Sequence, residues 1–218
     1  MKQKSLEVFI NGPSGRLEAK YFKNQKRGSP IAIVLQPHPQ YGGTMNNRVV
    51  QEMYNVFIKN GFSVLRLNFR GVGKSEGKFE NGLGELADAA AALDFVQRSN
   101  PNSNESWVIG FSFGALICMQ LLMRRPEIFR FVAISPQPNI FDFNFLAPCP
   151  TSGLVVYGNG DQLVPKESMQ QLKTKLINQK NITVEFDEIK NANHSFVNLD
   201  GEFNNSLNNY IQKESRLF

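Results

Sequence analysis

Short apolar runs alternate with longer segments of helical periodicity along most of this chain. Short apolar runs between turn signals are typical of strands buried in a parallel sheet, whereas apolar positions three to four residues apart indicate helices. The predicted buried strands cover residues 31–35, 62–69, 107–109, 131–134, 154–157 and 182–189. Helices with one apolar stripe are predicted around residues 49–57, 86–93, 169–176 and 203–211, and a helix that is apolar on nearly all sides over residues 113–123.

Two further strands, over residues 6–10 and 16–22, flank a tight connection with the sequence Asn11-Gly12-Pro13-Ser14-Gly15 and predict an entry hairpin. Together with the βαβ alternation, they predict an α/β fold with a doubly wound, mostly parallel, eight-stranded sheet and helices on both faces. No composition shift or linker divides the chain. We therefore expect one domain over residues 1–218.

Composition narrows the range of partners. No run of about 18 apolar residues is present, and the N-terminus lacks the apolar stretch of a signal peptide, so we expect a cytoplasmic protein that does not bind membranes. The formal net charge is +5, but the basic residues are spread along the chain, and we expect no nucleic-acid partner. Cys118 and Cys149 are predicted to be reduced packing residues. With two histidines and two separated cysteines, the chain is expected to bind no metal, and we expect no cofactor.

The segment Gly110-Phe111-Ser112-Phe113-Gly114 falls between a predicted strand and a predicted helix. A G-x-S-x-G motif in that position places its serine on a sharp turn, and the two glycines let neighbouring backbone pass close by. The free N–H groups at the helix N-terminus can stabilise an oxyanion there. Ser112 is therefore the predicted nucleophile, and the alternative is a serine that only caps the helix.

A serine nucleophile needs a base, for which histidine is best suited at neutral pH. His38 follows the strand at 31–35, and His194 lies in a polar loop between the last strand and the last helix. Asp161 follows the strand at 154–157, so all these residues fall at the carboxyl edge of the predicted sheet. The order Ser112, Asp161, His194 is the triad order of α/β hydrolases, and it favours His194 as the base. Asp142 and Asp187 stay open as other acids, and His38 is more readily explained by a structural role.

The chain resembles the α/β-hydrolase superfamily over nearly its whole length, in particular its small lidless bacterial members. The resemblance is carried by residues 37–45, 68–77, the Ser112 motif, 160–165 and 193–196. It implies a Ser-His-Asp triad and an oxyanion hole formed by two backbone N–H groups. One is that of Phe113; because Pro39 has no N–H, the other is expected from Gln40 or a neighbour beyond it.

Only residues 137–152 separate two of the predicted strands, which leaves no room for a lid domain. This connection is rich in phenylalanine and is expected beside the active edge, although its rings could equally pack onto the core. The candidate substrate-lining residues are His38, Tyr41, Phe111, Phe141 and Phe143.

The predicted activity is hydrolysis of a small carboxylic ester through an acyl-enzyme, by a monomer or homodimer. A thioesterase or a short-peptide peptidase would use the same residues, and a noncatalytic binding protein of the same fold is the alternative from another class. Dienelactone hydrolases have a similar size and plan but typically carry cysteine where this chain has Ser112.

Overall fold

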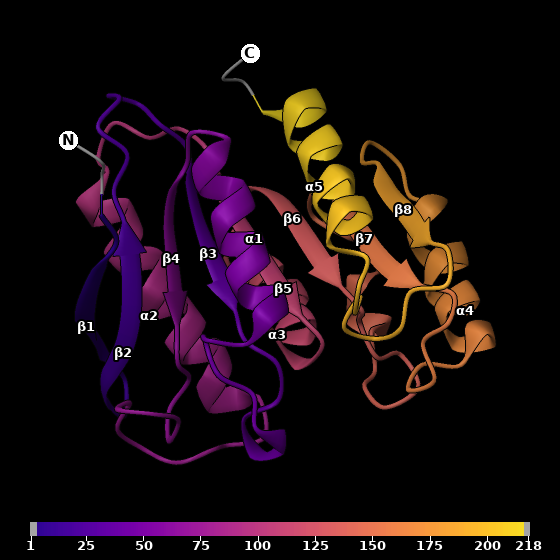
Figure 1. Cartoon of the computed structure of the whole chain (residues 1–218), viewed down its shortest axis with the longest axis horizontal. Helices are drawn as coiled ribbons and strands as arrows, with labels where there is room; N and C mark the ends of the chain where they lie inside the picture. The colour runs from indigo at the N-terminus through magenta and orange to yellow at the C-terminus, as the bar shows by residue number, and fades with distance from the viewer. Residues whose placement is uncertain (1–3, 216–218) are drawn as a thin grey trace.

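The computed structural model describes residues 4–215, which form a single eight-stranded sheet with helices on both faces (Figure 1). The strand order is β1-β2-β4-β3-β5-β6-β7-β8. β2 pairs antiparallel with β1 and with β4, and every other neighbouring pair is parallel. The strands are β1 (Leu6–Gly12), β2 (Gly15–Phe22), β3 (Ile31–Leu35), β4 (Ser63–Leu67), β5 (Ser106–Phe111), β6 (Ile128–Ile134), β7 (Gly153–Gly158) and β8 (Val184–Ile189). The predicted fold class is confirmed.

The helices cover the two faces of the sheet unequally. α1 (Arg48–Lys59) and α5 (Asp200–Glu214) lie in front of the sheet in Figure 1, and α2 (Leu83–Ser99), α3 (Phe113–Leu122) and α4 (Lys166–Ile177) lie behind it. Each face has its own apolar core, because strand side chains alternate between the two faces. Nine of the ten residues of α3 are buried, in agreement with its apolar sequence. Cys118 and Cys149 are both free and buried.

Four strands end one or two residues from the predicted positions, and hydrogen bonding explains the ends of β5 and β4. β5 continues through Gly110 and Phe111 because these residues still pair with β3 and β6. β4 ends at Leu67. The Asn68 N–H still donates to the Glu18 carbonyl of β2, but the next N–H, that of Phe69, leaves the ladder and donates to Oε1 of the Gln36 side chain. The first half of the Ser112 motif is thus the end of a central strand.

The connection from β6 to β7 contains one short 3₁₀ turn, Asn144–Leu146, and no lid domain. None of the helices within residues 4–215 has the length and apolar character needed to cross a bilayer.

Candidate active site

The turn between β5 and α3 holds Ser112 in a backbone conformation that few side chains adopt, with φ +56° and ψ −115°. Its N–H donates to the Ile134 carbonyl of the adjacent strand at 2.8 Å, which fixes the turn to β6. The glycines around it permit close backbone contact: a Cβ on Gly110 would lie 2.0 Å from the Gly114 carbonyl oxygen. Such strain, held by the surrounding structure, is typical of a functional serine.

Three predicted side chains meet at the carboxyl edge of the sheet. His194 Nε2 lies 3.1 Å from Ser112 Oγ, and His194 Nδ1 lies 2.7 Å from Asp161 Oδ2. The Asp161 side chain is only 3% exposed, and its other oxygen accepts the Leu163 N–H at 2.8 Å. A carboxylate so placed can hold the imidazole with Nδ1 protonated and Nε2 free to accept a proton from the serine.

The His194 loop is tied to the sheet by contacts that the sequence did not reveal. The hydroxyl of Ser135, a buried residue with φ +45° directly after β6, donates to the His194 carbonyl at 2.9 Å. On the outer side, the Arg48 guanidinium bonds to the Ser195 carbonyl and pairs with Asp200. These contacts orient the histidine, and they come from elements far apart in the sequence.

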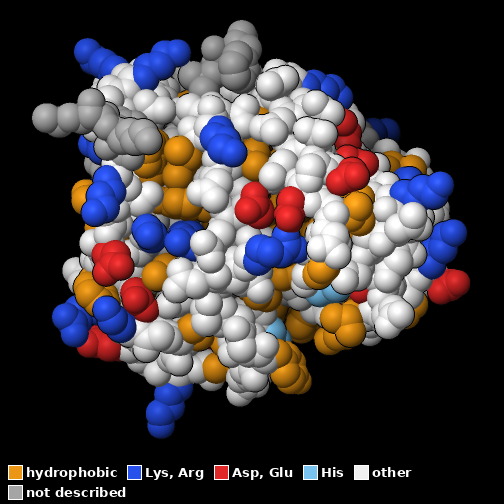
Figure 2. Space-filling view, viewed as in Figure 1, with side chains coloured by type: hydrophobic (Ala, Val, Ile, Leu, Met, Phe, Trp, Pro, Cys, Tyr) orange, Lys and Arg blue, Asp and Glu red, His pale blue; other side chains and the backbone are white. Residues whose placement is uncertain are grey.

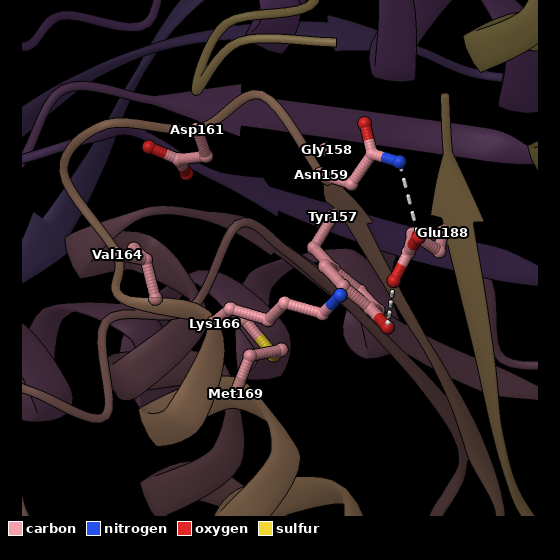
Figure 3. Close-up of a pocket in the computed structure, with 8 residues that line it drawn as sticks. All are labelled: Tyr157, Gly158, Asn159, Asp161, Val164, Lys166, Met169 and Glu188. Carbon is pink, nitrogen blue, oxygen red and sulfur yellow. Dashed lines mark hydrogen bonds between the residues drawn. The ribbon is translucent and has the colours of Figure 1, made fainter. Parts of the chain in front are cut away.

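A polar cluster lies behind the turn that carries Asp161 (Figure 3). Tyr157 donates its hydroxyl to Glu188 Oε2 at 2.9 Å, and the Asn159 amide donates to Oε1 of the same carboxylate at 3.2 Å. Burial, followed by the adjacent Glu188 carboxylate, raises the pKa of Tyr157 to about 12, so Tyr157 remains a donor. The Asp161 carboxylate points away from this cluster (Figure 3). The cluster links the end of β7 to β8 next to the turn that carries Asp161.

The predicted oxyanion donors differ in availability. The Phe113 N–H at the start of α3 is bonded to no acceptor among the described residues. The Gln40 N–H, in contrast, already donates to Nδ1 of His38 at 3.2 Å, and Gln40 does not line the cleft beside Ser112. Pro37 and Pro39 direct this loop into a 3₁₀ turn that His38 caps. The turn in this loop therefore makes Gln40 a poor candidate for the second donor.

A cleft of about 560 Å³ opens beside Ser112 and His194. The predicted lining residues His38, Tyr41, Phe111 and Phe141 contribute to its wall. Phe143 does not: its side chain is 3% exposed and packs in the core, so the prediction for this residue was wrong. Figure 2 shows histidine surface, in pale blue, in the lower part of the molecule beside hydrophobic side chains, in orange.

The cleft also contains residues that the sequence analysis missed. Ile140 and Leu163, which are 61% and 57% exposed, stand at its rim, and Gln137 Oε1 accepts a hydrogen bond from the Ser112 hydroxyl at 3.0 Å. No motif marks these residues, because the loops after β6 and β7 bring them together only in the folded chain. Within residues 4–215 there is no group of three or more His, Cys, Asp or Glu side chains placed to hold a metal ion.

Several known proteins are similar to this chain in sequence and in fold. An uncharacterized protein of Rickettsia prowazekii (strain Madrid E) is 48% identical over 209 residues, which cover 94% of this chain and 88% of that one. An Agrobacterium tumefaciens protein of unknown function is 50% identical, with a TM-score of 0.92 and 95% coverage of both chains. A lidless α/β serine hydrolase from Xanthomonas campestris is 26% identical, with a TM-score of 0.89 over 100% of this chain and 98% of that one. The family model of the X-Pro dipeptidyl-peptidases (S15 family) matches residues 14–198, and the chain therefore belongs to this family of α/β serine hydrolases.

Proposed function

We propose that this protein hydrolyses small carboxylic esters through an acyl-enzyme formed on Ser112. The observation that carries the proposal is the continuous contact from Ser112 Oγ to His194 and from His194 to the buried Asp161, at 3.1 and 2.7 Å. A hydroxyl is a poor nucleophile unless a base accepts its proton, and this chain of contacts supplies that base.

In the first half of the reaction, Ser112 Oγ bonds to the substrate carbonyl carbon while its proton moves to His194 Nε2. The tetrahedral intermediate collapses, the bond to the alcohol oxygen breaks, and His194 returns the proton to the departing alcohol. In the second half, water gives a proton to His194 and attacks the acyl carbon, and the acid leaves as Ser112 regains its proton. Asp161 keeps its charge throughout and stabilises the imidazolium.

The oxyanion is held by backbone N–H groups in this proposal. Phe113 supplies one of them, aided by the N-terminus of α3. For the second, the His38 N–H is better placed than that of Gln40, because it has no acceptor within residues 4–215 and Gln40 is already bonded. The loop before His38 lies against α3: a Cβ on Gly114 would meet the carbonyl oxygen of Gln36 at 2.6 Å.

The cleft favours an ester over an X-Pro peptide. A free peptide N-terminus is most often bound through a charge-assisted hydrogen bond from its ammonium group to a carboxylate. The described residues that line the cleft carry no carboxylate, and most of its surface is contributed by apolar side chains such as Phe111, Phe141 and Ile140. An uncharged acyl group matches this wall, and small thioesters would fit it equally.

The test is labelling with a fluorophosphonate probe followed by p-nitrophenyl acetate and butyrate hydrolysis. Ser112→Ala should abolish both labelling and turnover, whereas Ser195→Ala, which changes a serine on the same cleft, should keep both. Asp161→Asn should lower kcat by roughly 10³–10⁴-fold, because the wrong imidazole tautomer is favoured.

The matched control for the acid is Asp142→Asn. Asp142 is exposed and, among the described residues, bonds only to the nearby Asn144 N–H, so its variant should retain full activity. Preference for glycyl-proline p-nitroanilide over both esters would replace the ester proposal with a peptidase. A wild-type chain that is neither labelled nor active would support a binding protein instead.

A further inference from the structure

The side chain of Gln137 contacts the nucleophile, and no step of the proposed reaction requires it. Gln137 Oε1 lies 3.0 Å from Ser112 Oγ, as close as His194 Nε2 at 3.1 Å. The backbone of Gln137 is fixed, because its carbonyl accepts the N–H groups of Ile140 at 3.1 Å and Phe141 at 3.0 Å. The amide is therefore held at the reacting centre by a turn at the end of β6.

Ser112 has one hydroxyl proton, so it donates either to Gln137 or to His194 at a given moment. Reaction requires the bond to His194, which frees Gln137 when substrate binds. The Gln137 amide nitrogen has no hydrogen-bond acceptor within residues 4–215, and Gln137 lines a cleft whose surface is largely apolar. A polar donor fixed beside a nucleophile in such a cleft is typical of a residue that recognises substrate.

We propose that Gln137 is a specificity residue that donates a hydrogen bond to an acceptor on the acyl group, one or two bonds from the scissile carbonyl. This proposal rests on the proposed ester hydrolysis. The preferred acyl group then carries an ether, hydroxyl or carbonyl oxygen close to the reacting carbon, followed by an apolar part against Phe141 and Ile140. Gln137 Nε2 is bonded to the same carbon as Oε1, which lies 3.0 Å from Ser112 Oγ, so the amide donors lie close to the acyl group once its carbon is bonded to the serine.

The test compares two p-nitrophenyl esters of equal length, the methoxyacetate and the butyrate, which differ only by an ether oxygen in place of a methylene. The measured quantity is kcat/KM for the methoxyacetate divided by kcat/KM for the butyrate. Comparing this ratio between enzyme variants cancels the difference in intrinsic reactivity of the two esters. Gln137→Leu should lower this ratio about tenfold, the value of one hydrogen bond. Gln137→Glu keeps an acceptor at Ser112 but loses both donors, so the same fall is expected.

The control is Asn139→Ala, which removes a neighbouring amide that bonds to the Leu163 carbonyl, and it should leave the ratio unchanged. Fluorophosphonate labelling of Ser112 in each variant establishes that the nucleophile is intact. A ratio within twofold of wild type in both Gln137 variants, or an equal loss for both esters, would overturn the proposal while ester hydrolysis stands. If wild type is labelled but hydrolyses neither ester, the proposed function fails, and this proposal fails with it.

Discussion

The imidazole of His38 accepts a hydrogen bond at Nδ1 from the Gln40 N–H and packs between aromatic rings. Its centroid lies 4.6 Å from that of Tyr41 and 4.9 Å from those of Phe79 and Phe113. Accepting at Nδ1 requires an unprotonated nitrogen, and burial, only partly opposed by the Glu85 charge, lowers the pKa of His38 below its ordinary value of 6.5. The neutral ring thus maintains the loop that carries the proposed second oxyanion donor.

This residue predicts a pH dependence of stability. The unfolded chain protonates His38 at its ordinary pKa, above that of the folded chain, so this contribution to stability is complete above about pH 6.5 and is lost as the pH falls towards the folded pKa. His38→Asn keeps an acceptor for Gln40 without titrating. Between pH 7.5 and 5.5, the thermal midpoint of wild type should fall about 1–3 °C further than that of His38→Asn. Equal falls in a calorimetric scan would contradict this role.

The sequence predicted the site residues that a motif or a chain order marks, and it missed those that depend on a local turn. Ser112, Asp161 and His194 follow strand ends that the apolar pattern locates, and the structure brings them into contact. Gln137 contacts Ser112 from an irregular turn after β6, in which Ser135 has φ +45°. Phe143 was misplaced because an apolar residue in an irregular connection can face either the cleft or the core.

At the scale of elements, the site depends on how closely α3 approaches β3. Gly114 is the contact point: a Cβ there would lie 2.5 Å from the Leu35 carbonyl oxygen and 2.6 Å from that of Gln36. Backbone cannot yield as a flexible side chain can, so a larger residue must push α3 away from the strand. The motif's second glycine is therefore needed for packing as much as for the turn, which periodicity alone could not show.

Gly114→Ala should lower the free energy of unfolding by roughly 1–3 kcal/mol through overpacking. It should also reduce kcat, because the donor loop and the start of α3 separate. Urea unfolding and ester hydrolysis measure the two effects. The control is Gly201→Ala in α5, where a Cβ meets nothing within 4 Å and the change should be neutral or stabilising by up to about 1 kcal/mol. Similar stability for both variants would show that α3 can shift at little cost.

At the scale of the whole molecule, the absence of a lid leaves the cleft open and its apolar rim in contact with water. Tyr41 is 86% exposed, and Ile140 and Leu163 are more than half exposed. A short acyl chain can cover these side chains and remove apolar surface from water, at about 0.8 kcal/mol for each fully buried methylene. A longer acyl chain would extend past the rim into solvent, and its additional methylenes would contribute no further binding free energy.

The cleft therefore predicts a limit on acyl length. Along a p-nitrophenyl ester series, kcat/KM should rise about two- to fourfold for each added methylene and level off near six carbons, since each methylene is only partly buried. Ile140→Ser should flatten this rise, because it removes part of the apolar wall. Ile177→Ser is the matched control: Ile177 is also an exposed isoleucine but lies at the end of α4, away from the cleft. Faster hydrolysis of long-chain triglyceride than of the short esters would contradict an open, short-chain site, because such a substrate requires apolar surface far beyond the rim.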